Sequence, residues 1–87
     1  MISEERRRLG EIIKEARERA ALSRVELAEL LGTQSPVIYK YEDGDIVVIP
    51  FEKRIKMAKI LHIDLAELLY ENELGLLEFL KRKVGKK

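Results

Sequence analysis

The chain of 87 residues has no cysteine and no tryptophan, only two prolines and a single histidine. Without cysteine, neither a disulfide framework nor a thiolate metal site can form. The lone His62 has no second imidazole with which to share a metal ion, so we expect no metal site and no cofactor. No apolar run is long enough to cross a membrane. The charged segment 1–10 lacks the apolar core of a signal peptide, which favours a cytoplasmic protein.

The arrangements that catalysis needs are also missing from the chain. There is no nucleophile beside a base, no phosphate-binding loop and no patterned pair of carboxylates. Glu11, Glu15 and Glu18 have the spacing of ordinary charge partners on a helix surface. We therefore expect no catalytic residues and do not expect an enzyme.

The charge is nearly balanced, with 17 Lys and Arg against 16 Asp and Glu and a net of +1. Segment 23–44 holds two cations against four carboxylates, whereas segment 81–87 holds five cations and no acid. Any affinity for phosphate must therefore come from a few well-placed side chains and helix N-termini, not from a general positive field. The scarcity of Gln and Asn beside abundant Lys, Glu and Arg is typical of a thermophilic source.

Segment 23–44 carries the strongest local signals in the chain. Ser23 and Glu26 have the spacing of a capping box, in which each side chain satisfies the other residue's backbone N–H. Gly32 supplies a left-handed residue at which a helix can end. The sequence therefore predicts a short helix between these two signals.

A second short helix is predicted after a brief turn. Ser35 can cap it, Pro36 fits at its first position, and Gly44 ends it. Two capped helices joined by a tight turn that contains Gly are the signature of a helix-turn-helix. Nucleic-acid binding is therefore the leading functional hypothesis.

Apolar spacing predicts helices in the rest of the chain and no convincing sheet. One helix is expected over residues 4–21 with Ser3 as its cap, another over 51–61, and an amphipathic one over 71–84. His62 is expected to be the left-handed residue that ends the second of these. Asp64 and Glu67 are expected to form a second capping box, which starts a further helix that carries Leu65, Leu68 and Leu69.

From Leu9 to Leu69 the chain resembles the Cro/lambda-repressor-like, or XRE-type, helix-turn-helix DNA-binding domain family. The resemblance implies an all-α, compact five-helix domain over residues 1–70, followed by an additional C-terminal amphipathic helix and basic tail over 71–87. It rests on an ordered set of residues: Ala16-Arg17, Leu22-Ser23, Leu27-Ala28-Glu29, Leu31-Gly32, Ile38, Glu42, Gly44, Pro50, Ala58, Leu61, Leu65 and Leu68-Leu69.

The resemblance also implies roles for individual residues. Arg17 and Glu42 match an internal ion pair that ties the first helix to the end of the third. Arg24 stands where the family usually has Gln beside the DNA backbone, and an arginine there can hold a phosphate or simply remain exposed. Helix 35–43 is implied to enter the major groove of double-stranded DNA. The implied DNA-binding residues are Arg24, Gln34, Ser35, Pro36, Val37, Tyr39 and Lys40.

Some of these residues allow a second interpretation. Pro36 offers no hydrogen bond at a position where the family often reads a base. Val37 can pack against a thymine methyl group and Tyr39 can contact the DNA backbone or a protein, but both can instead complete the packing of a short helix.

Two apolar segments extend beyond what so small a core needs. The loop 46–49 and the C-terminal helix each have two alternative roles: they can pack on their own chain, or they can form a subunit interface. The candidate residues of a homodimer interface are Ile46, Val47, Val48, Leu74, Leu77, Phe79 and Leu80.

Two functions follow from these features. The first is a sequence-specific DNA-binding transcriptional regulator, expected to be a repressor and a homodimer. The alternative is a protein-interaction module of the same fold, either an antitoxin that neutralises a toxin or a coactivator bridge to the transcription machinery.

Overall fold

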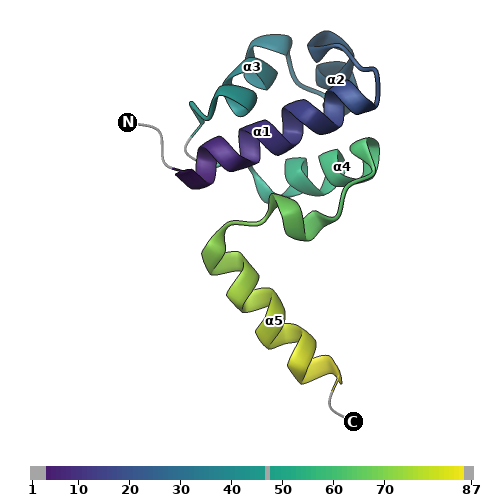
Figure 1. Ribbon diagram of the computed structural model, residues 1–87. Helices are drawn as coiled ribbons and strands as arrows, with labels where there is room; N and C mark the ends of the chain where they lie inside the picture. Colours follow the sequence, from purple (N-terminus) through teal and green to yellow (C-terminus); the bar gives the residue numbers. More distant parts are fainter. Residues whose placement is uncertain (1–3, 47, 86–87) are drawn as a thin grey trace.

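A computed structural model describes residues 4–46 and 48–85, without the side chains of residues 77 and 83–85. Over these residues the chain forms helices and no strands, which confirms the all-α fold class (Figure 1). The expected cap Ser3 and the interface candidate Val47 lie outside the described residues. The elements are α1 (Glu4–Arg19), α2 (Arg24–Leu31), α3 (Ser35–Asp43), α4 (Phe51–Leu61), the 3₁₀ helix η1 (Leu65–Leu68) and α5 (Glu71–Gly85).

The predicted ends of α2 are confirmed. Glu26 donates its backbone N–H to Ser23 Oγ at 3.0 Å, and Ser23 donates its own to Glu26 Oε1 at 2.8 Å, which completes the capping box. At the other end Gly32 has φ 71°. The next residue, Thr33, donates its N–H back to Ala28 O at 2.9 Å. A residue with a Cβ would be strained at this position, so the glycine sets where the helix stops.

The start of α3 lies one residue earlier than predicted. Ser35 is the first helical residue and not the cap, and extended Gln34 takes the cap position without a side-chain hydrogen bond. Pro36 therefore stands at the second position of the helix. Its missing N–H is harmless there too, because the first backbone bond is donated by Val37 to Gln34 O at 2.9 Å.

Two non-glycine residues with positive φ end helices. His62 has φ 55° and ends α4, as predicted. Ala21 has φ 57° and was not expected in this role. It follows the end of α1 at Arg19, where Leu22 N–H returns to Arg17 O at 3.1 Å and leaves α1 shorter than the predicted 4–21.

The segment after α4 is a single 3₁₀ turn where a fifth α-helix was expected. Asp64 Oδ1 accepts the N–H of Ala66 at 3.0 Å and makes no capping box with Glu67. The chain then extends at Leu69, and the consecutive residues 68–70 are all buried. Three successive residues of an α-helix point in different directions, so burying all of them favours a short turn followed by extended chain.

The core lies between α1, α2, α3, α4 and η1, with α1 packed against α3, α4 and η1. At the crossing of α1 and α3, Gly10 lies directly against the end of α3. A Cβ at Gly10 would be 2.3 Å from the carbonyl oxygen of Glu42. The absence of a side chain at this one position therefore sets how closely α1 approaches α3.

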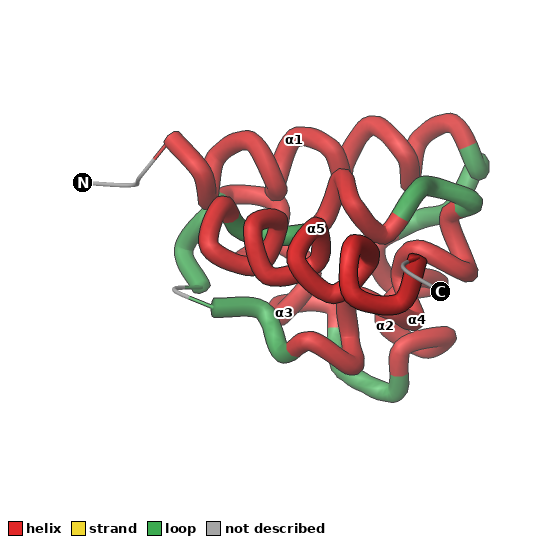
Figure 2. The backbone as a smooth tube through the Cα atoms, turned by 90° about the horizontal axis from the view of Figure 1, so that it is seen from below, coloured by secondary structure: helices red, strands yellow, loops and turns green. Residues whose placement is uncertain are grey.

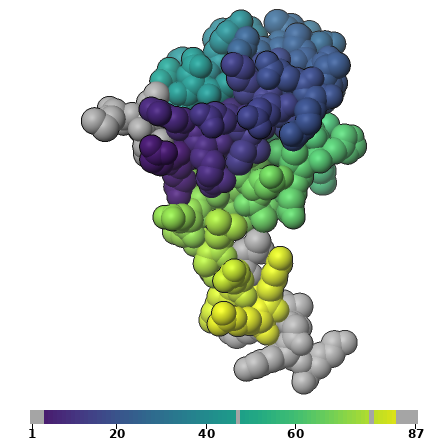
Figure 3. Space-filling view, in the orientation of Figure 1, coloured from purple at the N-terminus to yellow at the C-terminus, as the bar shows by residue number. Residues whose placement is uncertain are grey.

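The last helix, α5, projects from the side of the body that carries α4 (Figures 1 and 3). In the view from below, α5 lies nearest the viewer and in front of the body (Figure 2). The helices α2 and α3 lie at the opposite end of the molecule (Figure 1).

Candidate nucleic-acid interface

The α2–turn–α3 unit presents the outer side of α3 at one end of the molecule. Gln34, Pro36 and Lys40 are exposed, and Tyr39 is about half exposed. Ser35 is half-buried. The unit therefore offers one cation, one amide and one aromatic ring to a partner, in a patch that starts at the N-terminus of α3.

Val37 differs from its neighbours on this helix. It is half-buried and packs against the hydrophobic core. Its side chain thus contributes to holding α3 on the body, beside the fully buried Ile38.

Arg17 and Glu42 are brought together inside the protein, as the resemblance implies. Arg17 Nε donates to Glu42 Oε2 at 2.7 Å and Nη2 donates to Oε1 at 3.3 Å. The Nη1 group donates to Leu22 O at 2.8 Å. Both residues are more than nine-tenths buried. The end of α3 is therefore tied to α1 by a desolvated, bidentate ion pair.

Glu42 also accepts a hydrogen bond from the first residue of α2. Arg24 Nε lies 3.0 Å from Glu42 Oε1, and the Arg24 guanidinium lies over the Tyr39 ring, 4.2 Å from its centroid. The side chain of Arg24 remains 29% exposed. One carboxylate and one ring therefore hold Arg24 across the two helices while part of it faces solvent.

Because of this arrangement, two of the four carboxylates in segment 23–44 are already engaged within the protein. The formal charge of 23–44 counts Glu42 as one of four acids, but that carboxylate is buried between two guanidinium groups. A second acid, Glu26, is occupied by its capping box, and the hydrogen bond from the Ser23 backbone N–H lowers the pKa of its carboxyl. The cluster of one carboxylate and two arginines keeps a net positive charge near the exposed edge of Arg24.

Three structural residues of this unit were not expected from the sequence. Gly10 sets the approach of α1 to α3, as described above. Lys53 Nζ donates to Leu31 O at 2.7 Å and so caps the last turn of α2 from α4. Arg54 is 2% exposed and donates to Ile49 O at 2.9 Å and to Leu68 O at 3.0 Å. The contacts of Gly10 with Glu42, Lys53 with Leu31 and Arg54 with Leu68 join segments distant in sequence, so no local pattern predicts them.

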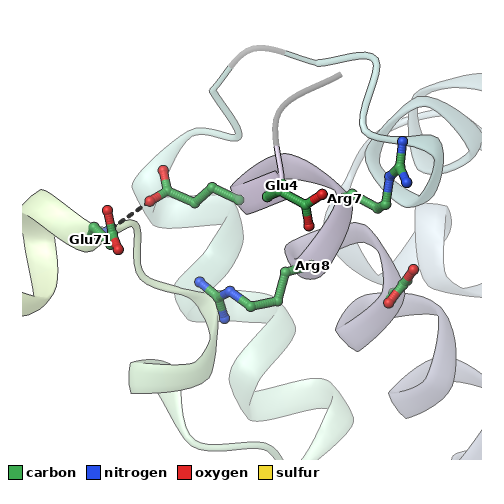
Figure 4. Close-up of a pocket in the computed structure, with 6 residues that line it drawn as sticks. Glu4, Arg7, Arg8 and Glu71 are labelled. Atoms are coloured by element: carbon green, nitrogen blue, oxygen red, sulfur yellow. Dashed lines mark hydrogen bonds between the residues drawn. The ribbon is translucent and has the colours of Figure 1, made fainter. Parts of the chain in front are cut away.

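A charged hollow of about 460 Å³ lies where α1 meets α5 (Figure 4). Two of its side chains hold the neighbouring chain in place: Arg8 donates to Leu69 O at 3.2 Å, and Glu5 accepts the N–H of Glu71 at 2.9 Å. Its lining residues are Glu4, Glu5, Arg7, Arg8, Glu11 and Glu71. These contacts give the hollow a structural role in attaching α5.

The interface candidates are divided between packed and exposed positions. Ile46 packs against the core, Leu74 is half-buried, and Val48 is exposed. Phe79 and Leu80 are both about half exposed on α5. The side chain of Leu77 is outside the described part of the structure.

Among residues 4–46 and 48–85, no group of three His, Asp or Glu side chains is placed to hold a metal ion. None of the helices in this part of the chain is long and apolar enough to cross a membrane.

A small all-α body that presents two short capped helices joined by a tight turn is a helix-turn-helix domain, the class of fold whose second helix reads DNA. The chain belongs to the helix-turn-helix domain family, because the model of this family matches residues 8–69. The match agrees with the resemblance that extends from Leu9 to Leu69. Membership of this family indicates a DNA-binding regulator. A search of curated proteins finds no match to the chain.

Proposed function

We propose that the protein is a sequence-specific transcriptional regulator that places α3 in the major groove of double-stranded DNA. In this proposal it acts as a homodimer and represses by occupying a promoter. The observation that carries the proposal is the cluster of Arg17, Glu42, Arg24 and Tyr39, which holds α2 and α3 in one orientation and presents a cation at their junction.

The exposed residues of α3 suit recognition of base edges. Lys40 can donate to the O6 and N7 atoms of guanine, and Gln34 can bind adenine through its amide. At the start of α3, Pro36 has no N–H and Val37 donates its N–H to Gln34 O at 2.9 Å, so recognition there depends mainly on side chains. These contacts come from the first turns of α3, the part of a recognition helix that reaches the bases.

Arg24 is suited to binding phosphate in this proposal. Its Nε donates to Glu42, and its guanidinium lies over the Tyr39 ring. These two contacts restrict the side chain to one orientation. A phosphate at the exposed edge of the guanidinium would balance the second positive charge of the cluster. Tyr39 then acts by positioning Arg24, and contacts DNA only at the edge of the interface.

Selection of bound sequences from random DNA, followed by anisotropy titrations at several salt concentrations, tests this function. Lys40→Ala should relax specificity at one base position, with a cost of roughly 1–3 kcal/mol on the preferred base. Arg24→Ala should weaken binding to all sequences and lower the salt slope by about 1. Lys59→Ala removes an exposed lysine from α4 and should leave both properties unchanged. Failure to enrich any sequence, with the wild-type chain folded, would contradict the proposal.

The alternative is a protein-interaction module, either a toxin-neutralising antitoxin or a bridge to the transcription machinery. The exposed Leu76, Phe79 and Leu80 of α5 favour it, because an apolar helix surface can bind a protein. Co-purification of one stoichiometric partner that is lost on Leu80→Glu would support this function. DNA binding by α3 and protein binding by α5 are compatible, since the two helices lie at opposite ends of the molecule (Figure 1).

A further inference from the structure

The helix α5 is attached to the body through its first turn. Glu73 accepts hydrogen bonds from Arg54 Nη2 and from the Tyr70 N–H, each at 2.8 Å. Glu5 accepts the N–H of Glu71 (Figure 4). Beyond this turn the helix extends away from the body (Figures 1 and 3). Because a free helix of this length is marginal in water, the projecting part needs a packing partner to be stable.

The side of α5 that faces α4 and η1 forms one wall of an apolar groove of about 280 Å³. Leu76 is 58% exposed and Leu80 is 48% exposed on this wall, and Phe51 opposite is 49% exposed. Phe79, at the edge of the same stripe, is 57% exposed. The groove residues are Phe51, Leu65, Leu69, Glu73, Leu76 and Leu80. A helix could lie along this groove and bury both of its walls.

Charge is distributed unevenly along α5. Its first turn carries the acids Glu71 and Glu73, and its later part carries the cations Lys81 and Arg82. An identical helix that runs in the opposite direction brings its basic end to the acidic end of the first. A parallel copy would place like charges side by side. The charge pattern therefore selects an antiparallel copy of the same helix.

We propose that α5 and its groove are the subunit interface of a symmetric homodimer, in which the two α5 helices pack antiparallel. This inference rests on the homodimer of the proposed function and names the surface that forms it. A two-fold axis near Glu78 places Leu76 opposite Leu80 of the partner subunit, and Leu80 opposite Leu76 of the partner subunit. Both subunits then contribute the same surface to the contact, as a two-fold interface requires.

The apolar area is consistent with such a dimer. Four large side chains, each about half exposed, offer roughly 100 Å² apiece, or about 400 Å² per copy. A standard interface buries about 800 Å² per partner, and somewhat more than half of that area is apolar. The exposed apolar residues thus supply most of the centre of an interface, and the charged ends of α5 supply part of its polar rim.

The mass of the full chain in solution tests the proposal by sedimentation equilibrium, over about 1 to 200 µM protein. The expected result is twice the chain mass of 10.1 kDa. Leu76→Glu with Leu80→Glu should raise the dimer dissociation constant at least roughly 100-fold, since each leucine contributes about tenfold or more. Val25→Glu with Leu30→Glu places the same charges at equally exposed leucine and valine positions of α2 and should leave the mass unchanged. Circular dichroism on each variant separates loss of the dimer from loss of the fold.

A charge exchange tests the antiparallel direction. Reversing Lys81 and Arg82 to Glu should weaken the dimer. Adding Glu71→Lys, which this register places about one helical turn from both positions of the partner subunit, should restore part of the affinity. A monomeric wild-type chain overturns the proposal. A dimer that the leucine variants leave intact also overturns it, because the interface would then lie elsewhere, such as at the 46–49 loop. Dimerisation without rescue overturns the antiparallel direction. DNA binding is measured separately by titration, so failure of the interface and failure of the DNA-binding function give different results.

Discussion

Replacing Glu42 by Gln should destabilise the protein more than any other single loss of charge in the helix-turn-helix. The substitution keeps the shape of the side chain but leaves the Arg17 guanidinium with a neutral partner in a site more than nine-tenths buried. Removing one partner of a buried ion pair typically costs about 3–5 kcal/mol. We expect a cost near the lower end, about 3 kcal/mol, because the amide oxygen can still accept one of the hydrogen bonds.

The same carboxylate makes a second, weaker contact that provides an internal comparison. The side chain of Arg24 is 29% exposed, so solvent screens its interaction with Glu42. Arg24→Met should therefore cost much less stability than Glu42→Gln. Asp43→Asn removes a neighbouring exposed carboxylate and should change the free energy of unfolding by less than about 0.5 kcal/mol. The order of the three effects follows from burial alone.

Urea unfolding followed by circular dichroism, at one fixed protein concentration, measures these differences. For a domain of this size, about 3 kcal/mol corresponds to a lower Tm by roughly 12–24 °C. The double variant Arg17→Met with Glu42→Gln should recover part of the loss, because no unpaired buried guanidinium remains. A cost for Glu42→Gln below about 1 kcal/mol, or one equal to that of Asp43→Asn, would refute the argument from burial.

Four further substitutions test other features of the fold. Gly10→Ala should lower stability by about 1–3 kcal/mol despite the higher helix propensity of alanine, because its Cβ meets the end of α3. At Gly75 an added Cβ would meet no other part of the protein within 4 Å, so Gly75→Ala should instead raise stability by up to about 1 kcal/mol in thermal melts. Equal effects at both glycines would contradict the packing argument. Ala21→Gly should raise stability by about 1 kcal/mol by relieving the positive φ, and a lower Tm would contradict this. Hydrogen bonds from Arg54 lower the pKa of Glu73 below its ordinary 4.5. The stability that Glu73 contributes is therefore present above about pH 4.5 and is lost as the pH falls through the lower folded value. Glu73→Gln should flatten the decline in urea stability between about pH 5 and 3, and an unchanged decline would remove Glu73 as its cause.

The features that were predictable from the sequence are those decided within a few residues. The capping box of Ser23 and Glu26 spans three residues, and Gly32 and His62 end helices by their own backbone conformation. Such signals act in the isolated segment, so they identify α2 and the end of α4 without knowledge of the rest of the chain. The two-helix unit and the family to which it belongs follow from these signals.

Where local preference and packing compete, the structure departs from the prediction. Asp64 and Glu67 have the spacing of a capping box, yet the burial of residues 68–70 limits the segment to one 3₁₀ turn. Ala21 has no intrinsic preference for positive φ, and it adopts this conformation because Leu22 returns its N–H to α1. Burial outweighs the small energies of local propensity at residues 68–70, whereas at Ala21 the hydrogen bond that closes the end of α1 does so.

The sequence by itself determined that this is an all-α helix-turn-helix domain, because apolar spacing and helix caps are properties of short segments. Only the tertiary structure decided what its charged residues do. Arg24 reads as a surface cation but shares a buried carboxylate with Arg17, and Arg54 reads as one more exposed charge but lies in the core among carbonyl oxygens. An arginine becomes structural only when distant segments surround it with acceptors, and that enclosure is a product of folding, not of local sequence.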